Sequence, residues 1–363
     1  MRSTACILLV LFSIINLRSQ TQATLDKLVE NTGKNALING VTLHLVKGDS
    51  VFTSSTGNLT VQDQYFIAST TKLYTTAVIM CLKADNKLDL DDPISNFLSS
   101  DILSKLHIYK GVDYSNKITI RHLLSQTSGL PDYFEGKKGN GKTLLYEISE
   151  EQKDQSWTSE EAIALAKTMQ PLFTPGAVGK AHYSDTNYQL LGLIIEKISQ
   201  QTLEENYTKY IYKKLGLKNT YLFTSSSEVP KSLHYKKDEL AIPLAMSSFR
   251  ADGGIVSTAA ESFVFLKAFF DGTLFPETLL DKSGTFNKLF FPIMYGTGYM
   301  KITLPKSMNG FKEFPVLYGH SGLSGAFAFY CPEKNMYITG TVNQISHPDI
   351  AYKLLFRIIR SIE

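Results

Sequence analysis

Segments with strand character lie at the two ends of this 363-residue sequence, and helical periodicity fills its middle. Near the start, residues 41–47 (VTLHLVK) and 51–55 favour strands, and the Gly48-Asp49-Ser50 segment between them is typical of a hairpin turn. Strand character returns in residues 298–304, 326–330 and 336–342. Because strands from both ends must share a core with the helices between them, we expect an α+β fold. In this expected fold, one sheet combines N- and C-terminal segments, and a helical lobe of about residues 92–245 is inserted between them.

Helices are expected in the middle of the chain and at its end. Four of them are expected at residues 24–31, 118–126, 159–169 and 188–199. A closing amphipathic helix is expected to begin at Pro348. Ser159 is the expected N-cap of its helix, because Glu160 and Glu161 follow in the first turn. A cleft between the sheet and the helical lobe is the natural place for a reaction centre.

The N-terminus has the pattern of a secretory signal. Arg2 precedes an apolar stretch at residues 5–17, which is too short to span a bilayer, and polar residues follow at 18–22. Residues 21–23 offer a small-x-small cleavage site, so we expect residues 1–23 to be a signal peptide and residues 24–363 to form a single domain. The expected location is secreted or periplasmic, with no stable membrane span after cleavage. An uncleaved membrane anchor is the alternative.

Composition excludes several classes of function. Charged residues make up 20% of the sequence with nearly balanced signs, and no Lys/Arg-rich run indicates nucleic-acid binding. Cys81 and Cys331 each lie in an apolar run and are predicted to be small core residues, although a disulfide between them stays open. No Cys/His spacing suits zinc. We therefore expect no metal and no cofactor.

Ser69 and Lys72 are the first candidates for chemistry. If a helix begins near Ser69, the two side chains lie on the same face one turn apart, so the amine can reach the hydroxyl. A serine hydroxyl is a weak nucleophile that needs a base, and a lysine can serve as that base. The S-x-x-K spacing is found only here in the sequence. Lys72 lies within an apolar helical run, where burying its charge would cost free energy unless the lysine had a functional role.

Five segments in order resemble those of one enzyme superfamily. They are FIASTTKLYTTAVIMCLKADNKLDLDDPISNFL, ITIRHLLSQTSGLPDY, FTPGAVGKAHYSDTNYQLLGLIIEKIS, ADGGIVSTAAE and YGHSGLSGAFAFY. Together they resemble the serine β-lactamase and penicillin-binding protein superfamily, in particular the branch of class C β-lactamases, D-alanyl-D-alanine carboxypeptidases and related esterases. The resemblance implies an antiparallel sheet flanked by helices, with a helical lobe inserted, and Ser69 and Lys72 as catalytic residues.

The second motif of that superfamily, Tyr-x-Asn, corresponds to Tyr183-Ser184-Asp185. The resemblance implies that Tyr183 relays a proton between Ser69, Lys72 and the leaving group. Asp185 departs from the pattern, because an asparagine amide can donate to a substrate carbonyl whereas an ionised aspartate only accepts. Asp185 is therefore expected either to pair with Lys72 or to favour substrates with a donor or a positive charge.

The third motif, Lys-Thr-Gly or His-x-Gly on a strand, corresponds to His320-Ser321-Gly322. The resemblance implies that this segment binds substrate, with His320 orienting or polarising an acidic group. Gly322 would let the substrate approach the strand backbone. The backbone N–H groups of Ser69 and Leu323 are the implied oxyanion hole.

These residues predict acyl transfer through an acyl-serine intermediate on an amide or ester bond of a small molecule or peptide. Carboxypeptidase-like or esterase activity is favoured. The alternatives are a class C-like β-lactamase and a non-hydrolytic penicillin-binding or sensor protein. The physiological substrate and the oligomeric state stay open.

Overall fold

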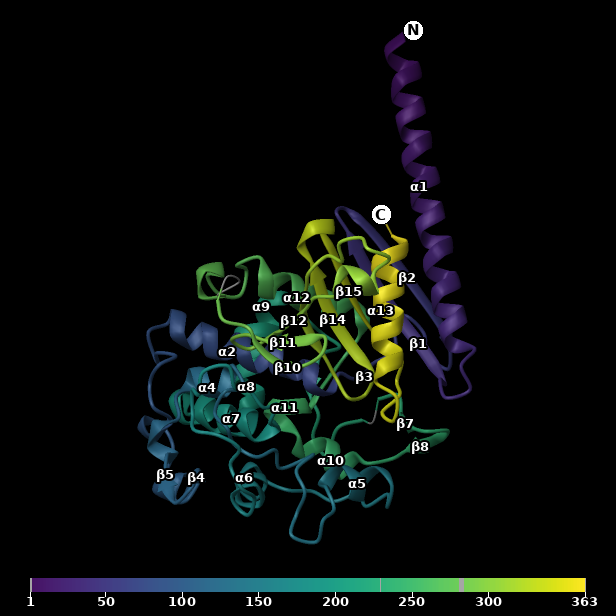
Figure 1. The fold of residues 1–363 in the computed structure, drawn as a ribbon. Coiled ribbons are helices and arrows are strands. Elements are labelled where there is room, and N and C mark those ends of the chain that lie inside the picture. Colours follow the sequence, from purple (N-terminus) through teal and green to yellow (C-terminus); the bar gives the residue numbers. More distant parts are fainter. Residues whose placement is uncertain (1, 229, 281–283, 363) are drawn as a thin grey trace.

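A computed structural model describes residues 2–228, 230–280 and 284–362, with side chains from residue 18 onward. Its main feature is an antiparallel eight-stranded sheet in the order β10-β11-β12-β13-β14-β15-β1-β2 (Figure 1). The strands are β1 (Gly40–Lys47), β2 (Ser50–Gly57), β10 (Asn287–Phe290), β11 (Ile293–Tyr295), β12 (Met300–Ile302), β13 (Leu317–Ser321), β14 (Ala326–Cys331) and β15 (Met336–Thr341). The N-terminal hairpin pairs with the last strand, with Thr42 opposite Thr341. The predicted α+β sheet from both chain ends is thus confirmed.

Helices cover both faces of this sheet. Helix α1 (Arg2–Gly33) and the closing helix α13 (Asp349–Ser361) lie beside each other on one face (Figure 1). Their apolar side chains, including Leu25, Val29 and Leu354, share a core with that face. Helix α12 (Ala259–Phe270) packs on the other face. The expected short helix at residues 24–31 is part of α1, which also runs through the predicted cleavage segment.

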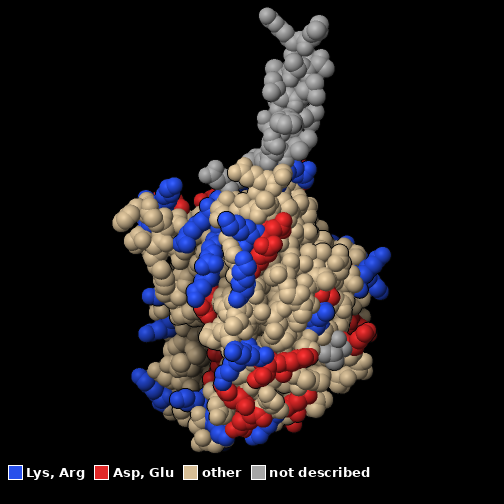
Figure 2. Space-filling model, turned by 90° about the vertical axis from the view of Figure 1, so that its right-hand side faces the viewer, with Lys and Arg blue, Asp and Glu red and all other residues tan. Residues whose placement is uncertain are grey.

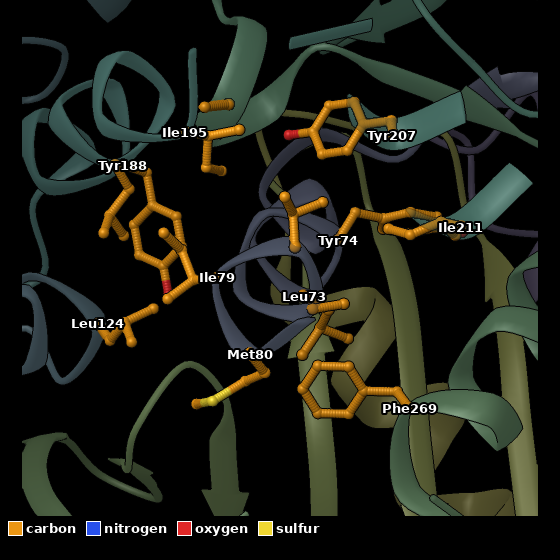
Figure 3. Packing of buried hydrophobic residues seen from close by; sticks show 14 of the residues in the cluster. Leu73, Tyr74, Ile79, Met80, Leu124, Tyr188, Ile195, Tyr207, Ile211 and Phe269 are labelled. Carbon is orange, nitrogen blue, oxygen red and sulfur yellow. The ribbon is translucent and has the colours of Figure 1, made fainter. Parts of the chain in front are cut away.

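The helical lobe packs around helix α2 (Thr71–Ala84). Its residues from Thr71 to Leu82 are all buried, including the polar Thr71, Lys72, Thr75 and Thr76, and its apolar side chains pack in the core of the lobe (Figure 3). Tyr74 stacks on Phe265 with ring centroids 3.5 Å apart. The remaining helices are α3 (Ser100–Leu103), α4 (Ile120–Leu124), α5 (Leu144–Ser149), α6 (Ser159–Lys167), α7 (Asp185–Ser199), α8 (Leu203–Tyr207), α9 (Lys213–Leu215), α10 (Pro243–Ser248) and α11 (Arg250–Gly253).

Three small sheets support the loops around the lobe. They are β3 (Tyr65–Phe66), β9 (Ile255–Ser257) and β6 (Tyr221–Leu222); β4 (Ile108–Tyr109) with β5 (Val112–Asp113); and β7 (Leu233–Tyr235) with β8 (Asp238–Leu240). Strands of two or three residues are too short to show alternation, so sequence periodicity did not predict them. The β3–β9 pair is the one that helps to position Ser69, because Ser69 follows β3 closely in the chain.

Several local predictions need correction. The N-cap of α6 is Thr158, whose hydroxyl accepts from Glu161 N while the Glu161 carboxylate accepts from Thr158 N. Ser159 instead donates to the Gln189 side chain, 2.6 Å away. The two cysteines, which could have formed a disulfide, are both buried and unpaired.

The surface is mixed in charge. On the face drawn in Figure 2, basic and acidic side chains lie close to one another around a broad uncharged area. Within the described part of the chain, no helix has the length and apolar character needed to cross a bilayer.

Candidate active site

Ser69 lies where the small β3–β9 sheet turns into helix α2. Ile67 N donates to Ile255 O at 3.0 Å, which fixes the segment just before it. Ala68 has a φ of +46°, a left-handed conformation that costs an alanine about 1–2 kcal/mol. Ser69 then sits in a 3₁₀ turn, and α2 begins at Thr71. Such backbone strain is common at functional sites, and here it holds the Ser69 side chain at the edge of two cavities.

Lys72 is fully buried and makes three polar contacts. Its Nζ lies 3.0 Å from Ser69 Oγ, 2.7 Å from the backbone oxygen of Asp252 and 2.7 Å from Asp185 Oδ1. The first two contacts are hydrogen bonds that Lys72 donates, and the third is an ion pair in which Asp185 Oδ1 is not aligned for a hydrogen bond. The predicted reach from Lys72 to the Ser69 hydroxyl is therefore present.

Asp185 is the first residue of α7, where the helix dipole stabilises a negative charge. Its carboxylate is only 9% exposed and forms the ion pair with Lys72. Its backbone N–H donates to Asp132 Oδ1 at 3.2 Å. Of the two roles expected for Asp185, the pairing with Lys72 is the one that the structure contains.

Tyr183 faces the same centre. Lys72 Nζ lies 5.0 Å from the centre of its ring, within cation–π range. Its hydroxyl is buried and forms no hydrogen bond of good geometry with the described residues, although it faces Ser69. Burial and the Asp185 charge raise the pKa of Tyr183 well above its ordinary value, and Ser69 lowers it only in part. The phenol therefore keeps its proton at neutral pH and is suited to donate it.

Three further carboxyl groups surround this centre, and the sequence analysis missed them. Asp132 and Asp252 are 5% and 1% exposed, and burial together with the Asp185 charge raises the pKa of both well above the ordinary value. Tyr133 Oη and Gln189 Nε2 each donate to Asp252 Oδ2 at 2.9 Å. Glu135 is an exposed residue, and the partial burial of its carboxyl group together with the Asp185 charge raises its pKa. It forms no ion pair within the described residues.

The turn after β13 docks on the segment that carries Ser69. Ser324 Oγ donates to the backbone oxygen of Phe66 at 2.7 Å. A Cβ atom at Gly322 would lie 2.3 Å from Ile67 O, so only glycine allows this approach. Ser69 and Leu323 both line the two cavities, and their backbone N–H groups stay the predicted oxyanion hole.

His320 is a buried residue of strand β13. Its ring is fully buried and lines neither cavity. Its Nδ1 lies 2.7 Å from Ser321 O and its Nε2 lies 3.0 Å from the Tyr295 hydroxyl, so the geometry assigns the proton to Nδ1. Burial and the nearby Lys72 lower the pKa of His320 to about 3. The neutral ring thus supports the backbone of β13, and the predicted contact of His320 with an acidic substrate group stays a prediction.

Two cavities flank Ser69. The narrower one, about 70 Å³, has an apolar wall of residues such as Phe134, Ile148, Leu233 and Phe249. The wider one, about 490 Å³, is lined by Ser321, Gly322 and Tyr352, among others. Tyr352 comes from α13, and its hydroxyl is in hydrogen-bond contact with Ser321 Oγ. Sequence reasoning assigned that helix an apolar face only and could not place Tyr352 at the site.

Charge is unevenly distributed around these cavities. Their described lining residues include the four carboxyl groups Asp132, Glu135, Asp185 and Asp252. None of the described lining residues is a lysine or an arginine. In the described chain, no three His, Cys, Asp or Glu side chains are grouped so that they could hold a metal ion.

Comparisons with known proteins agree with this architecture. The family model described as Beta-lactamase matches residues 25–354. The chain belongs to the beta-lactamase family, a family of serine hydrolases. Protein flp of Staphylococcus aureus strain N315 is 29% identical over 213 residues, which cover 54% of this chain. The match spans only 36% of the length of that relative.

Solved structures of similar fold include two amide hydrolases. A D-stereospecific amidohydrolase from Streptomyces sp. has a TM-score of 0.76 at 24% identity, covering 92% of this chain and 97% of that one. The D-amino acid amidase from Ochrobactrum anthropi SV3 has a TM-score of 0.75 at 21% identity, covering 94% and 100%. At these identities the likeness establishes the shared fold.

Gly322→Ala tests the close approach of β13 to Ser69. The added methyl group collides with the Ile67 carbonyl and displaces Leu323, so hydrolysis should fall by about 100-fold while the fold is retained. Steady-state kinetics and circular dichroism check this. Gly139→Ala is the matched control, since nothing lies within 4 Å of its Cβ position. Equal activity of both variants would refute the proposed contact.

Asp252→Asn tests the protonation of the buried carboxyl groups. Because the pKa of Asp252 is raised in the folded state, the wild type loses stability as pH rises from the unfolded pKa, about 4, through the folded value. The asparagine variant does not titrate, so its stability relative to wild type should increase from about pH 4 to about pH 8. Thermal unfolding at both pH values measures the change, with exposed Asp49→Asn as control. A relative decrease would contradict a raised pKa.

Proposed function

We propose that this protein hydrolyses small amides or esters through an acyl-Ser69 intermediate, and that its preferred substrates carry a free amino group and an uncharged leaving group. The observation that supports this proposal is Glu135, a carboxyl group that lines both cavities and forms no ion pair within the described residues, whereas neither lining includes a described lysine or arginine. Opposite charges attract strongly in a partly buried site, and like charges repel. An ammonium group is thus favoured there, and a substrate carboxylate is not.

The chemistry follows from the contacts at Ser69. The Ser69 oxygen attacks the substrate carbonyl and gives its proton to Lys72 Nζ, 3.0 Å away, when that lysine is in its neutral amine form. The oxyanion is stabilised by the N–H groups of Ser69 and Leu323. The Tyr183 phenol gives its proton to the leaving group and regains one from Lys72. Water then releases the acyl group by the reverse proton path.

Glu135 is the group best placed to bind the substrate amine. It lines both cavities beside Ser69, and it forms no ion pair within the described residues. The apolar wall of the narrower cavity suits an aliphatic or aromatic side chain next to that amine. The names of the two similar structures, a D-stereospecific amidohydrolase and a D-amino acid amidase, support amide hydrolysis of this type.

Other functions of the family fit these charges less well. Substrates of a carboxypeptidase and most β-lactams carry a carboxylate, which would face Glu135 in a lining without a described lysine or arginine, while Lys72 beside Ser69 is already paired with Asp185. Ester hydrolysis remains compatible, since an ester leaving group is uncharged. A purely binding protein would not need Lys72 within hydrogen-bond distance of the Ser69 hydroxyl.

We also infer that residues 1–23 act as a secretory leader and that residues 24–363 form one domain with a helical lobe at about residues 92–245. The apolar stretch at residues 5–17 and the adjacent small-x-small site support the leader. The shared core of the N-terminal hairpin and the C-terminal strands supports a single domain.

Glu135→Gln tests the amine site. For leucine amide, we expect KM to rise about tenfold, the equivalent of about 1.4 kcal/mol of lost binding, while N-acetyl-leucine amide is hydrolysed equally by both proteins. Both enantiomers are assayed, and exposed Glu160→Gln is the control. A dipeptide with a free carboxylate should be a poorer substrate than its amide. A wild-type preference for N-acetylated or carboxylate-bearing substrates would contradict the proposal.

A further inference from the structure

Gln126 contacts the chain on both sides of Tyr183. It follows helix α4, is fully buried and has a φ of +59°, a left-handed conformation that a glutamine rarely adopts. Its backbone oxygen accepts a hydrogen bond from His182 N at 2.9 Å, and its side-chain Oε1 accepts one from Ser184 N at 3.0 Å. One residue therefore holds the two amide groups that flank Tyr183.

The side-chain amide of Gln126 has one orientation that fits these contacts. A backbone N–H group only donates, so the atom that faces Ser184 N must be the oxygen. The same oxygen accepts from Asn187 Nδ2 at 2.5 Å, while Asn187 Oδ1 accepts from the Ser128 hydroxyl at 2.6 Å. Gln126 Nε2 is buried and forms no hydrogen bond within the described residues. Only the oxygen of this side chain is thus in use.

The Tyr183 hydroxyl depends on support of this kind. It forms no hydrogen bond of good geometry within the described part of the chain, so its own polar contacts do not fix its place. Its ring packs against Tyr295 and His320, with centroids 6.1 and 6.2 Å away. We propose that Gln126 is a positioning residue, which holds the Tyr183 phenol where it can give its proton to the leaving group. This inference rests on the proposed acyl-serine chemistry.

A positioning role predicts a loss of rate that depends on the leaving group. An amide nitrogen must gain a proton before it can leave, whereas p-nitrophenolate leaves as a stable anion. Displacement of the Tyr183 hydroxyl should therefore slow acylation by an amide and leave acylation by a p-nitrophenyl ester nearly unchanged. A general loss of folding or of substrate binding would slow both reactions by the same factor, because the two substrates share their acyl group.

The experiment compares kcat/KM for leucine amide and for leucine p-nitrophenyl ester, because kcat/KM reports the acylation step. Gln126→Asn suits the left-handed backbone, but its side chain is one methylene too short to reach Ser184 N. It should lower the amide value by about 10- to 100-fold and the ester value by less than about threefold. Gln126→Glu keeps an oxygen acceptor at the same length, so its amide value should stay within about threefold of wild type.

Ser128→Ala is the matched control, since the Ser128 hydroxyl bonds to Asn187 and Leu130 N rather than to the residues beside Tyr183. It should change the amide and ester values by the same factor. In a Tyr183→Phe background, Gln126→Asn should cause no further loss for the amide, because the group that it positions is gone. Thermal unfolding checks that each variant is folded. Gln126→Met, which keeps the length but has no oxygen, takes the place of Gln126→Asn if that variant does not fold.

Three results would overturn the inference. They are equal losses for the amide and the ester in Gln126→Asn, a further loss for the amide on top of Tyr183→Phe, and an amide value in Gln126→Glu as low as in Gln126→Asn. Absence of fluorophosphonate labelling of Ser69 in wild type would instead remove the proposed function. That reaction requires only a reactive Ser69, since its fluoride leaving group needs no proton.

Discussion

The buried Lys72 ammonium and its three oxygen partners are the contact on which the site depends. They join the turn before α2, the backbone of α11 and the first residue of α7, which are far apart in the sequence. A buried charge that loses a partner costs several kcal/mol, so these three elements must meet in one arrangement. The strained Ala68 and the close fit of Gly322 then place Ser69 against both that lysine and strand β13.

The charge pattern around this contact links the site to its substrates. Asp185 neutralises Lys72, and Tyr133 and Gln189 hold the Asp252 carboxyl group in place. Glu135 has no comparable partner among the described residues. It is therefore the carboxylate most available to a ligand, beside a serine whose reactivity is set by the same cluster.

Patterns within short stretches of the sequence predicted those contacts whose partners lie close together in the chain. The hairpin of β1 and β2 follows from alternation and a turn signal, and the contact of Ser69 with Lys72 follows from spacing along one helical turn. The family resemblance located Tyr183 and the segment around Gly322. The cluster of Asp132, Glu135 and Asp252 could not be predicted, because its members meet only through tertiary packing. The hydrogen bonds of the His320 ring could not be predicted either, since sequence does not tell which side of a buried strand carries a ring.

The most direct test of the central claim is intact-protein mass spectrometry after treatment with a fluorophosphonate and, separately, a fluorescent penicillin. We expect a single fluorophosphonate adduct, mapped to the peptide that contains Ser69 and absent from Ser69→Ala. Because the cavities disfavour a carboxylate, penicillin should label weakly or not at all. An adduct that persists in Ser69→Ala, or the absence of any fluorophosphonate adduct in wild type, would contradict the assignment of Ser69 as the nucleophile.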